Sequence, residues 1–123
     1  IAQKYTNELQ IKTPSLKQTV RNLSGGNQQK VALSKGLAIE PDILIIDEPT
    51  VGIDVKTKSE IHRIMYDLTT KGKSVICITS DMMEIVQIAD RIIVFKDGMI
   101  AGEIINNKDY DQMSKKIMNL IME

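Results

Sequence analysis

Residues 43–50 read Ile-Leu-Ile-Ile-Asp-Glu-Pro-Thr, and this stretch decides the class of fold. Four consecutive bulky apolar residues, followed by Asp47-Glu48-Pro49, indicate a short strand that is buried on both faces, as the strands of parallel sheets are. Ligands of open parallel sheets bind beyond the carboxyl ends of the strands, where these two carboxylates fall. The stretch therefore predicts a buried parallel strand that ends in an acidic pair at a binding edge.

The segments on either side alternate between helical and strand patterns. From apolar periodicity and from flanking Gly and Pro, helices are expected over residues 1–9, 24–39, 55–69, 82–89 and 110–120. A second buried strand is expected over residues 74–79. A hairpin is expected from strands over residues 91–96 and 99–104, with its turn at Asp97-Gly98. The alternation predicts an α/β fold, with a mostly parallel sheet, flanking helices and a C-terminal antiparallel hairpin. The one expected sub-boundary lies near residues 13–22.

The composition narrows the class of protein. The 123 residues include sixteen basic and sixteen acidic side chains, three Tyr, one Phe and no Trp. Balanced charge and few aromatic rings argue against a nucleic-acid partner. The single cysteine, Cys77, excludes an internal disulfide and suits a reducing compartment. No apolar stretch is long enough for a membrane span. Because Ile1 falls within a helical pattern, we expect the chain to be part of a longer protein.

A second chemically suggestive stretch is Leu23-Ser24-Gly25-Gly26, at the start of an expected helix. Two glycines leave no side chains between the backbone and a ligand, and the first N–H groups of a helix are free to bind an anion. The Ser24 hydroxyl adds a donor beside them. Taken alone, however, Ser-Gly-Gly is more often an N-cap serine followed by a flexible turn.

The acidic pair also has two interpretations. One carboxylate can orient Mg²⁺ through its water shell, and the next can position or deprotonate a water for in-line attack on a phosphoryl group. Two solvated acids at a strand end are the alternative, and the pair alone favours that one. Asp54, a little further on, is in addition a good N-cap for the helix expected from Val55.

Together these stretches resemble the motifs of ATP-binding cassettes, over roughly residues 20–104. Residues 23–30 resemble the signature motif, and residues 43–50 resemble the Walker B motif, in the order and at the separation that this family has. The resemblance implies a P-loop NTPase fold and assigns a role to each matching residue. It makes Asp47 the magnesium residue, Glu48 the general base and Asp54 part of the D-loop that crosses between paired domains. It also assigns five residues to contacts with the γ-phosphate of an ATP molecule that the opposite domain holds: Ser24, Gly25, Gly26, Asn27 and Gln28.

Finer features resemble the second cassette of ribose- and galactose-type sugar importers, which join two cassettes in one polypeptide. They are Asn27-Gln28-Gln29-Lys30, residues 49–55 and Thr79-Ser80-Asp81. This likeness implies ATP and Mg²⁺ as cofactors, a partner cassette (in the same polypeptide or as a homodimer), transmembrane permease subunits and, indirectly, an extracytoplasmic sugar-binding protein. It also implies a place at the cytoplasmic face of the membrane. Residues 1–40 would end a helical subdomain, and residues 41–123 would carry Walker B, the D-loop, the switch region and the hairpin.

Two features depart from the family pattern. Ser80 is a further expected nucleotide contact, and it stands where most cassettes have a histidine. Second cassettes of this subgroup commonly lack that histidine. Ser80 is also expected to cap the next helix. No Walker A loop is present, because Gly72-Lys73-Ser74 leads from helix to strand and Asp67 stands where the first glycine is needed. Two alternatives stay open: a nucleoside or autoinducer importer of the same architecture, and a catalytically incompetent fragment. A soluble cassette acting on ribosomes or DNA is a third rival, but its usual Asn-His-Leu-Asp D-loop and basic inserts do not occur here.

Overall fold

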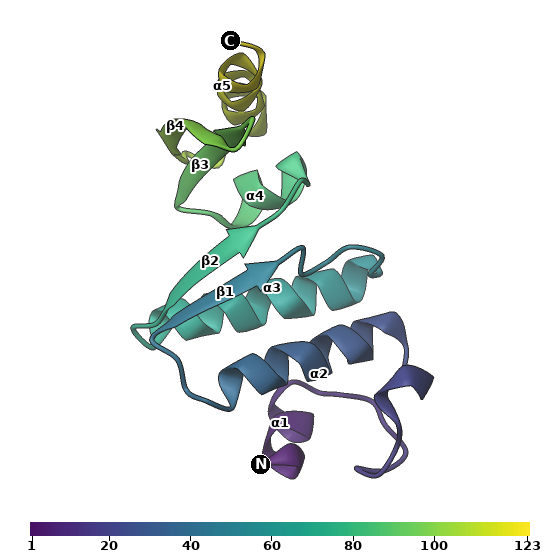
Figure 1. Cartoon of the computed structure of the whole chain (residues 1–123). Helices are drawn as coiled ribbons and strands as arrows, with labels where there is room; N and C mark the ends of the chain where they lie inside the picture. The colour runs from purple at the N-terminus through teal and green to yellow at the C-terminus, as the bar shows by residue number, and fades with distance from the viewer. The chain divides into compact units, whose positions relative to one another are not determined.

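The computed structural model describes the chain from residue 1 to residue 123 (Figure 1). Helices come first, strands and helices alternate through the middle, and a hairpin and a last helix follow. The chain forms two compact units, residues 1–78 and residues 79–123. The sub-boundary expected near residues 13–22 lies inside the first unit, because the helices on either side of it pack together there.

The first unit is a βαβ crossover preceded by helices. Its elements are α1 (Ala2–Glu8), the short 3₁₀ helix η1 (Val20–Asn22), α2 (Gly25–Leu37), β1 (Ile43–Asp47), α3 (Val55–Thr70) and β2 (Ser74–Ile78). Strands β1 and β2 pair in parallel, from Ile43 opposite Ser74 to Asp47 opposite Ile78. Helix α3 connects them, as a parallel pair requires. The carboxyl ends of both strands therefore lie side by side, which places the acidic pair at one edge of this sheet.

One face of this two-stranded sheet is open. Leu44 is buried, and its Cδ1 lies 3.1 Å from the position that a β-carbon on Gly36 of α2 would take. The apolar side chains with at least half of their surface exposed are Ile43, Ile45, Ile76 and Ile78. The expectation that β1 and β2 are buried on both faces is therefore wrong for this chain. Apolar composition shows that a face suits burial, whereas actual burial also needs an element that packs on that face.

The second unit is a helix-packed hairpin with its own core. Its elements are α4 (Met82–Ile88), β3 (Arg91–Lys96), β4 (Met99–Ile105) and α5 (Tyr110–Met122). The turn uses Asp97 at φ +50° and Gly98 at φ +76°, the left-handed pair that a tight two-residue hairpin demands. The buried side chains that hold this unit together are Val86, Ile92, Val94, Ile104, Met113 and Ile117. The expected hairpin and terminal helix are confirmed.

Candidate functional site

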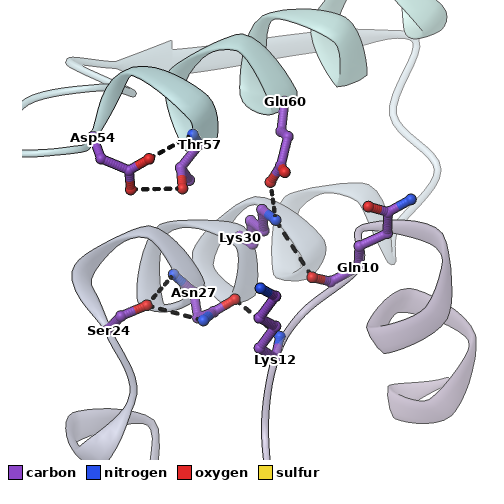
Figure 2. A network of polar contacts seen from close by, with 8 residues as sticks. All are labelled: Gln10, Lys12, Ser24, Asn27, Lys30, Asp54, Thr57 and Glu60. Atoms are coloured by element: carbon purple, nitrogen blue, oxygen red, sulfur yellow. Dashed lines mark hydrogen bonds and ion pairs between the residues drawn. The ribbon is translucent and has the colours of Figure 1, made fainter.

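Ser24 caps helix α2 and is bound by the third residue of that helix. The Ser24 Oγ accepts the Asn27 backbone N–H at 3.3 Å and the Asn27 Nδ2 at 2.9 Å. The Asn27 Oδ1 in turn accepts the Lys12 backbone N–H at 2.9 Å, as Figure 2 shows. The expected N-cap is therefore present, and Asn27 fixes it to the segment that follows α1.

Gly25 and Gly26 have different surroundings, although they are adjacent in sequence. Gly25 is exposed, and the nearest atom to a β-carbon built on it is the Gly52 carbonyl oxygen at 4.0 Å. Gly26 is buried, and its β-carbon would lie only 2.6 Å from Cγ2 of Thr57 on α3. Gly25 thus leaves the backbone at the helix start open, whereas Gly26 permits α2 to approach α3 closely.

Gln28 is used within the chain itself. Its Nε2 donates to the carbonyl oxygens of Leu23, at 2.9 Å, and Arg21, at 3.3 Å. The side chain thus satisfies carbonyl groups at the end of η1, so it holds the loop that leads into α2.

Asp54 caps α3, as its sequence position predicts. Its two carboxylate oxygens accept the Thr57 backbone N–H at 3.0 Å and the Thr57 Oγ1 at 2.8 Å. These two hydrogen bonds favour the ionised form and hold the pKa of Asp54 below its usual value. Because Thr57 also contacts Gly26, the structure brings Asp54 close to the start of α2 (Figure 2).

The acidic pair sits on an unusual backbone at the end of β1. Asp47 is exposed, and Glu48 is half-buried with φ +46°, the left-handed region that residues other than glycine rarely adopt. The Glu48 N–H donates to the Ile78 carbonyl oxygen at 2.8 Å, and Pro49 behind it is fully buried. Strained conformations of this kind persist where the surroundings impose them, and they are frequent at functional sites.

Ser80 lies in the second unit, directly after β2, and is exposed. It does not cap α4, contrary to expectation, because Asp81 does so by accepting the Glu84 N–H at 3.0 Å. Glu84 is itself buried and accepts a hydrogen bond from Thr79 Oγ1 at 2.7 Å. The loop that carries Ser80 is therefore fixed by the residues on either side of it.

Sequence reasoning missed a charged pair between α2 and α3. Lys30 is buried, and its ammonium binds the carboxylate of Glu60 and the carbonyl oxygen of Gln10 (Figure 2). The Lys30 hydrogen bond is the main cause that lowers the pKa of Glu60. The helical spacing of Gly26, Lys30 and Leu33 was the available signal, since it puts the lysine on the buried face of its helix.

The structure contains no cluster of three or more His, Cys, Asp or Glu side chains that could hold a metal ion. Asp47 offers one exposed carboxylate at the strand end, beside Glu48. No helix has the length and apolar character of a membrane span.

Comparison with known sequences identifies relatives for most of the chain. A family model described as ABC transporter matches residues 1–51. The chain is 48% identical over 116 residues to the ribose import ATP-binding protein RbsA of Clostridium perfringens, which covers 94% of the chain and 23% of that protein. It is 53% identical over 102 residues to the xylose import ATP-binding protein XylG of Thermoanaerobacter pseudethanolicus, covering 83% of the chain and 20% of that protein. The chain thus spans less than a quarter of the length of these relatives.

Solved structures show the same fold. A dimeric ATP-binding cassette in a post-hydrolysis state, bound to ADP and Pi, matches with a TM-score of 0.76 and 30% identity, over 85% of this chain and 45% of that one. A nucleotide-free cassette from an ABC transporter matches with a TM-score of 0.83 at 20% identity, over 97% of this chain and 47% of that one. The expected cassette fold is confirmed.

Proposed function

Because this chain belongs to the ATP-binding-cassette ATPases, we propose that it is part of the ATP-hydrolysing subunit of an importer that couples ATP binding and hydrolysis to uptake of a monosaccharide. The observation that carries the proposal is the start of α2, where Ser24 caps the helix and the backbone of Gly25 is exposed without a side chain. It occurs in a chain that is 48% and 53% identical to ribose and xylose import proteins.

The start of α2 suits a phosphate group of a nucleotide held by a partner cassette. The first N–H groups of a helix carry partial positive charge, and Gly25 presents them without a β-carbon. Ser24 adds its hydroxyl at the same point. Asn27 and Gln28 support this site from within the chain, since both side chains bind neighbouring parts of it. Asp54, at the adjacent start of α3, would face the same partner.

The acidic pair would serve a second nucleotide, held on this side of the interface. Mg²⁺ in nucleotide sites is usually bound by one or two carboxylates together with substrate phosphates, and the lone exposed carboxylate of Asp47 fits that donor set. When bound, the ion supplies charge neutralisation at the phosphates. Glu48 would orient or deprotonate the attacking water, and its fixed, left-handed backbone would hold its carboxylate in place. Ser80, from the loop after β2, would donate a hydroxyl to the phosphates.

The proposed assembly contains a second cassette, a transmembrane permease and an extracytoplasmic sugar-binding protein. The relatives named above are import proteins, which supports a permease partner and a position at the cytoplasmic face of the membrane. Balanced charge, with sixteen basic and sixteen acidic residues, gives no support to a nucleic-acid partner.

The test uses the full-length protein reconstituted with its permease and binding protein in lipid vesicles. We expect ATP-dependent uptake of at least one of ribose, xylose, L-arabinose and galactose, together with Mg-ATP hydrolysis that this sugar stimulates. Uptake of a nucleoside such as uridine, without uptake of any of the four sugars, would contradict the proposal and favour the nucleoside importer.

A further inference from the structure

Two contacts, one helical turn apart, hold α2 against α3 beside the start of both helices. Gly26 meets Thr57 in the first contact. In the second, Lys30 binds Glu60 (Figure 2). Residues four or three apart share one helix face, so each helix contributes both of its members from the same face. The two helices therefore lie side by side and run in the same direction from neighbouring N-termini.

Lys30 is the central residue of this arrangement. It is only 4% exposed, and its ammonium also donates to the Gln10 carbonyl oxygen at 3.4 Å. A buried ammonium needs such partners, because burial without them is costly. Lys30 thereby connects three segments: the end of α1 at Gln10, its own helix α2, and α3 through Glu60.

Each of the two connected helix starts carries a group that we have assigned to the dimer interface. Ser24 caps α2, and Asp54 caps α3 through Thr57. A sliding movement of α3 along α2 would change the spacing between Ser24 and Asp54. The contact at Gly26 is steric and limits how closely the helices approach. The ion pair at Lys30 is directional and fixes position along the helices.

We propose that Lys30 is a positioning residue whose ion pair with Glu60 sets the spacing between Ser24 and Asp54. The inference rests on the proposed function, in which both helix starts face a partner cassette. Such a pair is a poor source of stability, because its desolvation offsets its attraction, but its geometry is specific. Its loss should therefore lower turnover more than it changes the KM for ATP, since it would displace Ser24 and Asp54 without removing either group.

The experiment separates positioning from stability with matched variants of the full-length transporter. Lys30→Met leaves the Glu60 carboxylate without its ammonium partner, whereas the double variant Lys30→Met/Glu60→Leu removes both charges and should recover the thermal midpoint. Lys30→Arg keeps the positive charge, and Lys35→Met is the control because Lys35 is exposed on the same helix. The readouts are kcat and KM for ATP, and the thermal unfolding midpoint.

We expect kcat to fall roughly ten- to a hundredfold in both Lys30→Met and the double variant, the loss typical of a misplaced catalytic group. The KM for ATP should change little, and Lys30→Arg and Lys35→Met should remain close to wild type. A double variant that regains both the midpoint and the kcat of the wild type would overturn the inference, because the pair would then be structural only.

A wild-type transporter without ATPase activity would refute the proposed function instead. Amide hydrogen exchange on the same full-length variants would then decide the inference. Faster exchange in both residues 24–27 and 54–57 of the double variant supports it, and exchange equal to that of the wild type overturns it.

Discussion

Gly26 approaches Thr57 so closely that a β-carbon on Gly26 would lie 2.6 Å from Cγ2 of the threonine. Real β-carbons essentially never come that close to a neighbour, so a substitution at Gly26 must displace the Thr57 side chain or move the two helices apart. The glycine therefore has a packing role in addition to any role at a phosphate. A carboxylate placed at Gly26 to repel a phosphate would also disturb the packing, which makes exposed Gly25 the better position for that experiment.

The first prediction follows directly from this contact. Gly26→Ala should destabilise the fold by about 1–3 kcal/mol, the usual cost of overpacking, whereas Gly25→Ala should change stability much less. Urea unfolding of both variants measures the difference. Thr57→Ser removes Cγ2 but keeps the hydroxyl that binds Asp54, so it should recover part of the loss in a Gly26→Ala background. Equal destabilisation at the two glycines would contradict the assigned packing role.

The second prediction concerns pH. The Thr57 hydrogen bonds lower the pKa of Asp54 in the folded protein, so its carboxylate stabilises the fold at pH values above its unfolded pKa. This contribution is lost as the pH falls through the lower, folded pKa. Asp54→Asn keeps a capping oxygen but does not titrate. The wild type should have the higher Tm at pH 6, and the difference should shrink as the pH approaches 3; a difference that is constant with pH would contradict the assignment.

The third prediction concerns the open face of β1 and β2. Both strands are edge strands, and half or more of the surface of Ile45 and Ile76 is exposed. Exposed apolar faces and free strand edges promote association. A polypeptide of these 123 residues should therefore self-associate at high concentration in light scattering, and Ile45→Thr/Ile76→Thr should shift it toward monomer. A monomeric wild-type polypeptide with its β1–β2 pair intact would refute this.

Local signals in the sequence were sufficient for most of the fold. Asp97-Gly98 predicts the hairpin because Asp-Gly favours a two-residue turn with both residues at positive φ, which the structure has. Asp54 predicts its cap from position alone. Ser80 and Asp81 show the limit of such signals, since both are good caps and the pattern does not locate a helix end to one residue.

The features of the candidate site that the sequence did not predict depend on tertiary contacts. The sequence around Gly26 does not predict its contact with Thr57, and the sequence around Lys30 does not predict its ion pair with Glu60. Each contact joins residues that are distant in the chain. The left-handed backbone of Glu48 was not predictable from the sequence either, since it depends on how the end of β1 meets β2 at Ile78. Motif resemblance proposes the residues of the candidate site, whereas the contacts that support them became visible only in three dimensions.

In the proposed assembly, the start of α2 contributes to the nucleotide held by the partner cassette, and this composite site carries the turnover. By the resemblance described above, Ser80 stands where most cassettes have a histidine, so we expect Glu48 to matter less to turnover than a general base usually does. Gly25→Asp would place a carboxylate at the helix start, where repulsion from a phosphate should reduce transport to near background. Glu48→Gln should cost far less than the ~10²–10⁴-fold typical of losing a base at a site that limits turnover.

The decisive measurement is the ATPase rate, together with sugar uptake, of Gly25→Asp and Glu48→Gln in the complete transporter, with Gly25→Ala as the steric control. We expect near-complete loss in Gly25→Asp, a mild loss in Glu48→Gln, and in Gly25→Ala a partial loss that is far smaller than that of Gly25→Asp, because the added methyl group crowds the phosphate but does not repel it. Equal collapse of Gly25→Asp and Glu48→Gln, or a milder effect of Gly25→Asp, would contradict this expectation and assign the turnover to the site around Glu48.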